Sequence, residues 1–248
     1  MTITRRRPMY GIFDRDTREE IISADGLEGF FVEAGSPERG EIGLVNARPG
    51  VRSPLGSNDS EIQIFNWSGE VIGSYHLGAV KILTSGSCEG AMDETGSHSF
   101  IGYTSEYFEA GEIWSRWASG IPLALGEWAL RPAGHHESWL HVSQTSWFAV
   151  RRGNARIGKD ESISIDGLMM PVKASFYCAI GEAANGPGGY LGSNLDALSK
   201  CLLRAGDEAP VRRVEWKNFS VAEEVLGREF TADVASVFED SGVLLIRN

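Results

Sequence analysis

The sequence has few cysteines, no long apolar run and a deficit of basic residues. Three cysteines among 248 residues are too few for a disulfide framework, which favours reduced thiols and a cytoplasmic location. No apolar stretch approaches the length that a membrane-spanning helix needs. The arginines near the N-terminus are not followed by the apolar segment of a secretory signal. We therefore expect a cytoplasmic protein that has no membrane partner.

The charge balance is acidic, with 34 aspartate and glutamate residues against 23 lysine and arginine residues and a formal net charge of −11. Proteins that bind nucleic acid directly present a basic face to the phosphates, so we expect no direct nucleic-acid partner. An acidic surface can instead attract a basic protein. The chain length fits one large domain or two modest ones.

Residues 1–158 have the pattern of a β-rich domain. Short apolar or aromatic runs are separated by glycines, and some alternate apolar and polar residues, as in EIQIFNW. A turn at Ser68 and Gly69 is expected to join two of these strands. The runs SWLHVS and SWFAVRRGN, which begin at Ser138 and Ser146, are also expected to be strands.

One segment of this first part differs from the rest. In YFEAGEIWSRWASG, Ile113, Trp114 and Trp117 have helical spacing and a glycine follows, which predicts one short helix. The pattern then changes near RRGNARIGKDE, a polar stretch that contains glycines and is typical of a linker. We therefore expect two domains, residues 1–158 and residues 159–248.

Residues 159–248 predict an α/β domain. The expected order is strand, helix, helix, strand, helix, helix, strand, which indicates a small parallel sheet with helical crossovers. Ser220 is the expected N-cap of the third helix, and Gly206 and Gly242 are expected just after two helices. The last strand is apolar enough to be buried on both faces. The expected elements are SISIDG, KASFYCAIGEAAN, SNLDALSKCLLRAG, VRRVEW, SVAEEVLG, FTADVASVFEDSG and VLLIRN.

The stretch NGPGGYLGSNLDAL, residues 185–198, is the most glycine-rich part of this domain. A dinucleotide-binding loop needs three glycines at fixed spacing directly after a strand, and a nucleoside-triphosphate loop needs a lysine after its last glycine. This stretch follows a helix and has neither pattern. The glycines are therefore expected to turn the chain between two helices.

The longer run SFYCAIGEAANGPGGYLGSNLDALSKCL resembles the signature of the barstar family, the intracellular protein inhibitors of barnase-type, guanyl-specific ribonucleases. The segments IDG, VEWKNF and VASVFEDSG match in register on either side of it. The resemblance covers roughly residues 160–248. It implies a barstar-like α/β domain, a three-stranded parallel sheet with packed helices, preceded by a β-rich domain of unknown function.

The resemblance also implies a binding protein without enzymatic activity, cofactor or metal. Barstar-like inhibitors occupy the active site of the ribonuclease with an acidic helix and the loop before it, so their carboxylates replace phosphate in a basic cleft. The implied partner is a basic protein, a secreted ribonuclease or a nuclease toxin. The alternative is an immunity or regulatory protein whose N-terminal domain binds the partner and whose barstar-like part is structural.

Particular residues can be placed on the family's binding surface. Two positions depart from the family prototype, which has tryptophan and aspartate where this chain has Ser199 and Lys200. A lysine facing a basic cleft costs affinity, and Lys200 can pair within the helix with the acidic residue four positions before it. The partner-binding residues that the resemblance implies are Tyr190, Gly192, Asn194, Asp196, Ser199, Lys200 and Asp240.

Several of these residues also have purely structural interpretations. Ser193 and Asp196 have the spacing of a capping box, which would stabilise the start of a helix without any partner. Tyr190 could be a packed side chain rather than an exposed anchor. Asp240 near a helix C-terminus opposes the helix dipole, which hints at function. Cys178 and Cys201 are expected to be buried.

The first domain offers two weaker catalytic or metal-binding hypotheses. GSCEG at residues 86–90 copies a nucleophile elbow with Cys88 in place of serine, but a poor helix follows it. His135, His136 and His141 do not have the spacing of a metal site. We expect the histidines to be ordinary polar residues, and the tryptophans of this region to be core residues.

Overall fold

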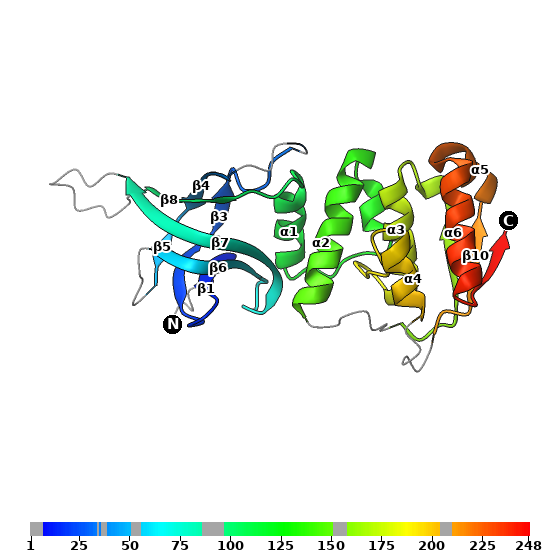
Figure 1. Cartoon of the computed structure of the whole chain (residues 1–248), viewed down its shortest axis with the longest axis horizontal. Coiled ribbons are helices and arrows are strands. Elements are labelled where there is room, and N and C mark those ends of the chain that lie inside the picture. Colours follow the sequence, from blue (N-terminus) through cyan, green and yellow to red (C-terminus); the bar gives the residue numbers. More distant parts are fainter. Residues whose placement is uncertain are drawn as a thin grey trace. The chain divides into compact units, whose positions relative to one another are not determined.

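The computed structural model describes residues 7–33, 35, 39–50, 56–85, 97–150, 158–203 and 210–248. The chain forms two compact units, Met1–Ile121 and Pro122–Asn248, which Figure 1 draws from blue to green and from green to red. We call them the N-terminal unit and the C-terminal unit. Each is described by itself.

The N-terminal unit is an antiparallel sheet that closes on itself. β2 runs into β3 through Asp25, and β4 runs into β5 through Asn46 and Ala47, while β3 pairs with β4 and β5 pairs with β2. The two ends of the sheet are therefore formed by the same two chain segments, and closure leaves few free strand edges. The strands are β1 (Tyr10–Asp14), β2 (Glu20–Ala24), β3 (Gly26–Glu28), β4 (Arg39–Val45), β5 (Arg48–Pro49), β6 (Gly56–Phe65), β7 (Val71–Ser85) and β8 (Ser97–Tyr103).

The expected turn at Ser68 and Gly69 is confirmed, since it joins β6 to β7. Asn66 organises this turn, because its Oδ1 accepts hydrogen bonds from the backbone N–H groups of Ser68 and Glu70 at 3.0 and 2.9 Å. Gly69 has a φ of +84°, a conformation that costs glycine nothing. The β-rich character expected for this region is also confirmed.

Helix α1 (Ala110–Ala118) is the short helix that the spacing of Ile113 and Trp114 predicts. Both side chains are fully buried in the unit. The Trp114 ring lies against Gly73 of β7, where a Cβ atom would come within 2.4 Å of it. The Trp114 N–H donates to the hydroxyl of Tyr75 at 2.8 Å. A glycine in the strand thus makes room for the largest side chain of the helix.

The C-terminal unit contains the predicted three-stranded parallel sheet, in the order β11-β10-β9. Inward residues of β9 and β10 are buried and outward residues are not, so helices cover one face of the sheet. The elements are η1 (Glu127–Leu130), η2 (Ala133–His135), α2 (His136–Ala149), β9 (Ser162–Asp166), η3 (Gly167–Met169), α3 (Lys173–Asn185), α4 (Leu195–Leu203), β10 (Arg213–Lys217), α5 (Phe219–Leu226), α6 (Arg228–Asp240) and β11 (Leu244–Arg247).

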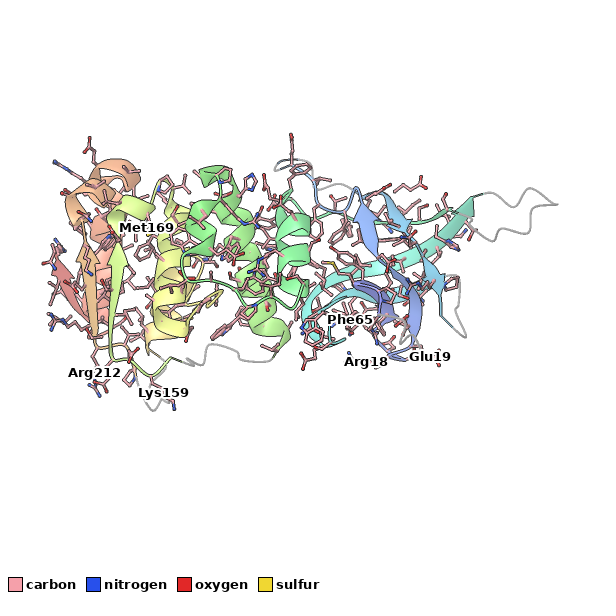
Figure 2. All side chains as sticks on the ribbon, turned by 180° about the vertical axis from the view of Figure 1, so that it is seen from behind. Arg18, Glu19, Phe65, Lys159, Met169 and Arg212 are labelled. Carbon is pink, nitrogen blue, oxygen red and sulfur yellow. The ribbon has the colours of Figure 1, made fainter. Side chains whose placement is uncertain are left out.

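The side chains in Figure 2 help to trace this sheet. Lys159 and Arg212 lie where the chain enters β9 and β10, and Met169 lies beyond the other end of β9, on η3. The neighbouring starts of the two strands are tied together, since the backbone N–H of Arg212 donates to the carbonyl of Glu161 at 2.8 Å and their side chains form an ion pair. The buried Trp216 of β10 stacks on Phe176 of α3.

Two expected strands are wrong, because residues 136–149 form helix α2. The runs that begin at Ser138 and Ser146 are short, and a short apolar run fits a buried helix as well as a strand. In the helix Trp139, Val142 and Trp147 are buried. Residues 151–154 of the second run lie outside the described residues.

Helix α2 belongs to the C-terminal unit, so the compact units of the structure do not divide where the sequence pattern changes. It packs against α3, so the compact units divide between Ile121 and Pro122 rather than between residues 158 and 159. A polar stretch with glycines marks a change of sequence pattern, but packing decides which elements form one unit. The expected domain boundary between residues 158 and 159 stays a prediction.

Of four local expectations for the C-terminal unit, two are wrong, one is confirmed and one lies outside the described residues. β11 is an edge strand, and Leu244 is 60% exposed, so the expectation of burial on both faces is wrong. Ser220 is not an N-cap, because α5 begins at Phe219 and Asn218 precedes it with a φ of +52°. Gly242 does follow the end of α6, with a φ of +70°. Gly206 lies outside the described residues.

A buried polar pair joins α2 to α3. His136 is 1% exposed, and its Nδ1 lies 2.8 Å from the hydroxyl of Ser175 while its Nε2 lies 3.2 Å from the carbonyl of Arg131. A neutral imidazole satisfies both contacts, with Nε2–H donating to the carbonyl and Nδ1 accepting from the hydroxyl. Burial is the main reason that the pKa of His136 is lowered below 6.5.

The lowered pKa of His136 predicts a pH-dependent stability. The fold prefers the neutral imidazole, so its contribution is complete above pH 6.5, the ordinary value, and is lost as the pH falls below that value. We expect urea unfolding to show a larger drop in unfolding free energy between pH 7.5 and pH 5.5 for the wild type than for His136→Gln. If His136→Gln has the same pH slope as the wild type, the assignment is wrong.

Candidate partner-binding surface

The loop between α3 and α4 is a tight turn that depends on its glycines. Gly186 and Gly188 have φ values of +80° and +70°, which other residues rarely adopt. The backbones of Gly181 on α3 and Gly189 in the loop touch, since a Cβ at Gly181 would lie 2.5 Å from the carbonyl of Gly189. The glycines turn the chain between two helices, as the sequence predicts.

Tyr190 is packed in this structure, with 3% of its surface exposed. Its ring lies 5.8 Å from that of Phe148 of α2, and its hydroxyl lies 3.3 Å from the hydroxyl of Ser193. The side chain of Asn185, at the end of α3, donates to the carbonyl of Tyr190 at 2.8 Å. Burial raises the pKa of the tyrosine. Tyr190 is therefore a packed side chain in the free protein, which was the structural alternative. That Tyr190 contacts a partner stays a prediction.

Gly192 and Asn194 prepare the start of α4. Gly192 has a φ of +110°, and a Cβ there would lie 2.6 Å from the backbone nitrogen of Leu198. The Oδ1 atom of Asn194 accepts from the backbone N–H of Ala197 at 2.8 Å, which is the N-cap bond. Asn194 therefore caps the helix, and the expected capping role of Ser193 is wrong.

The exposed side of α4 carries a carboxylate that is partly neutralised. Asp196 and Lys200 are both exposed, and the ammonium of Lys200 donates to Asp196 Oδ2 at 2.5 Å. The predicted pair within the helix is therefore present. An exposed pair of this kind contributes only about 0.3–0.5 kcal/mol to stability, so a partner can compete for either charge. Ser199, which lies between these two residues in the sequence, is half-buried.

Asp240 ends α6, the helix that packs beside α4. It and Glu239 are exposed, while Val234 and Phe238 of the same helix are fully buried. Negative charge at a helix C-terminus is unfavourable by about 0.3–1 kcal/mol. Asp196 and Asp240 are thus exposed carboxylates on two neighbouring helices that the core holds in place.

The comparison with protein families finds a similarity in this part of the chain. Residues 161–243 match the family model described as Barstar (barnase inhibitor). We call these matched residues the barstar segment. It extends from the residue before β9 to the residue before β11 and contains every proposed contact residue, while the N-terminal unit and α2 lie outside it. The comparisons with curated proteins and with solved structures found no match.

The barstar segment contains buried groups that the sequence reasoning placed correctly. Cys178 and Cys201 are buried, and burial raises the pKa of the Cys178 thiol, which disfavours the reactive thiolate. Cys88 and the GSCEG stretch lie outside the described residues. Among the described residues, no group of three or more histidine, cysteine, aspartate or glutamate residues could hold a metal ion.

Two residues beside the loop between α3 and α4 were not predicted from the sequence. Asn185 fastens the loop through the carbonyl of Tyr190 and also accepts from the backbone N–H of Gly158 at 3.2 Å. Its place between a helix and a run of glycines is a signal that could have singled it out. Phe148 lies in a run that was expected to be a strand, so no local signal pointed to it. In the part of the chain that the structure describes, no helix is long and apolar enough to cross a membrane.

Proposed function

We propose that this protein inhibits a basic, barnase-type ribonuclease by covering its active site with the start of α4, the preceding loop and the end of α6. The observation that carries the proposal is the barstar segment, whose exposed Asp196 and Asp240 lie on neighbouring helices. The domain responsible is residues 159–248, and the partner is a secreted ribonuclease or a nuclease toxin. The protein itself needs no catalytic group or cofactor for this role.

The physical basis of the proposed inhibition is substitution for RNA. A ribonuclease cleft holds phosphate with arginine, lysine and histidine, and carboxylates on rigid helices can form charge-assisted hydrogen bonds with the same groups. The glycine turn and the cap formed by Asn194 fix the start of α4 before binding. A surface fixed in this way loses little conformational freedom on association. The net charge of −11 increases the rate of encounter with a basic partner.

Titration of the full chain against the RNA-cleaving activity of a panel of barnase-type ribonucleases tests the proposal. We expect at least one enzyme to be inhibited at a one-to-one ratio at micromolar concentrations, and inhibition to weaken as salt is added, because opposite charges are screened. Retention of activity by every enzyme at micromolar inhibitor would refute it.

Lys200 is expected to limit the affinity for a barnase-type enzyme. Lys200→Asp removes a charge that repels a basic cleft and also frees Asp196 from its partner in the helix, so we expect the dissociation constant to fall about tenfold, or about 1.4 kcal/mol. Isothermal titration calorimetry against the same ribonuclease measures the change.

The charge-matched control for this variant is Lys217→Asp. Lys217 is an exposed residue of β10, so its replacement changes the net charge equally but lies outside the proposed surface. We expect it to alter the affinity far less than Lys200→Asp. Equal effects of the two variants, or a weaker complex with Lys200→Asp, would contradict a local role for Lys200.

A further inference from the structure

Phe148 is an aromatic residue beside the binding loop that comes from outside the barstar segment. It lies in the last turn of α2, and its ring packs against that of Tyr190 at 5.8 Å with an interplanar angle of 62°. Phe148 is 45% exposed, whereas Tyr190 is 3% exposed. On this side of the loop, the aromatic surface open to solvent therefore belongs to Phe148.

The exposure of Phe148 is not needed to hold α2 in place. Trp139 and Trp147 of the same helix are 1% and 3% exposed, and His136 joins the helix to Ser175 of α3. These residues bury the apolar area that fixes the helix. Phe148 leaves nearly half of a large apolar side chain in water, so covering it on association with a partner would be favourable.

Tyr190, the residue against which the Phe148 ring packs, is held in place by hydrogen bonds of its own. Tyr190 is fastened by the hydrogen bond from Asn185 to its carbonyl and lies 3.3 Å from the Ser193 hydroxyl. The Phe148 ring packs on this fixed residue, so it loses little conformational freedom when a partner binds. The face of the Phe148 ring also attracts the lysine and arginine side chains of a basic partner.

We propose that Phe148 is a contact residue for the basic partner and that it supplies the exposed aromatic surface that the buried Tyr190 does not. The proposal rests on the proposed ribonuclease-inhibitor function. Phe148 would contact the rim of the ribonuclease cleft. It adjoins the loop that leads directly into Asp196, and the rim of the cleft is basic where the carboxylates bind.

The test measures binding of the full chain to a barnase-type ribonuclease by calorimetry. We expect Phe148→Ala to raise the dissociation constant about tenfold, as the loss of an aromatic contact residue can, and Phe148→Lys to raise it further through repulsion. Phe148→Trp should keep the affinity within about threefold, because it keeps an aromatic face. Thermal unfolding of each variant checks that the fold is retained.

Phe108→Ala is the matched control, since Phe108 is 58% exposed and belongs to the N-terminal unit. It should leave the affinity unchanged. If the wild type binds and Phe148→Ala binds equally well, the role of Phe148 is refuted while the inhibitor function stands. Tighter binding by Phe148→Ala also refutes it, because α2 would then hinder the partner. If the wild type binds no enzyme of the panel, the proposed function and this inference both fail.

Discussion

Replacement of Gly192 by alanine is expected to lower the unfolding free energy by at least about 3 kcal/mol. Gly192 has a φ of +110°, and an added Cβ would lie 2.6 and 2.7 Å from the backbone nitrogen and Cα of Leu198. Both atoms belong to the first turns of α4 and cannot move as the end of a side chain can. The variant must therefore strain its own backbone and also displace the helix. Urea unfolding at pH 7.5 measures the change.

Gly242→Ala separates the two costs. Gly242 also has a positive φ, +70°, but no atom lies within 4 Å of the place that its Cβ would occupy. Only the backbone strain remains, and we expect a loss of about 1 kcal/mol. Equal losses for Gly192→Ala and Gly242→Ala would show that the close approach to α4 is not what requires glycine.

Replacement of Glu182 by leucine is expected to destabilise the C-terminal unit by about 2–3 kcal/mol. The carboxylate of Glu182 on α3 accepts from the indole N–H of Trp128 at 3.0 Å and from the backbone N–H of Gly126 at 2.9 Å, both through Oε2. Leucine leaves both donors without this acceptor, and Trp128 is 2% exposed. The loss is measured by urea unfolding of the full chain.

Glu182→Gln is the conservative control, because its amide oxygen can accept both hydrogen bonds. Burial raises the pKa of Glu182 above 4.5, so the wild type loses stability as the pH rises from that value and the carboxyl ionises. Glutamine does not ionise. The stability of Glu182→Gln relative to the wild type should therefore increase between pH 4.5 and pH 7. A relative decrease over this range would refute the raised pKa.

Gly192 and Glu182 stabilise the proposed partner-binding surface in different ways. Gly192 allows the loop to pass close to the backbone of α4. Glu182 on α3, the helix before the loop, holds Trp128, which precedes α2. A loss at either site should weaken partner binding through disorder of the loop, because ordering it would then cost free energy on association. The effect on affinity is expected to follow the effect on stability.

The order of elements in the barstar segment could be predicted from the sequence because its signals are local. Glycines end α3 and α6 where the chain must adopt a positive φ, and Phe230, Val234 and Phe238 lie on the buried side of one helix at helical spacing. The salt bridge between Asp196 and Lys200 is equally local, since residues four apart on a helix are neighbours. Each of these signals needs only a few residues of context.

The tertiary structure alone decided which surfaces are open. The residues of α2 fit a strand as well as a helix until they pack on α3. Tyr190 is buried, and its ring packs against Phe148, which is distant in the sequence. β11 is apolar but lies at the edge of the sheet, so Leu244 is exposed. Burial depends on which segments meet in space, and residue spacing within one segment carries no information about that.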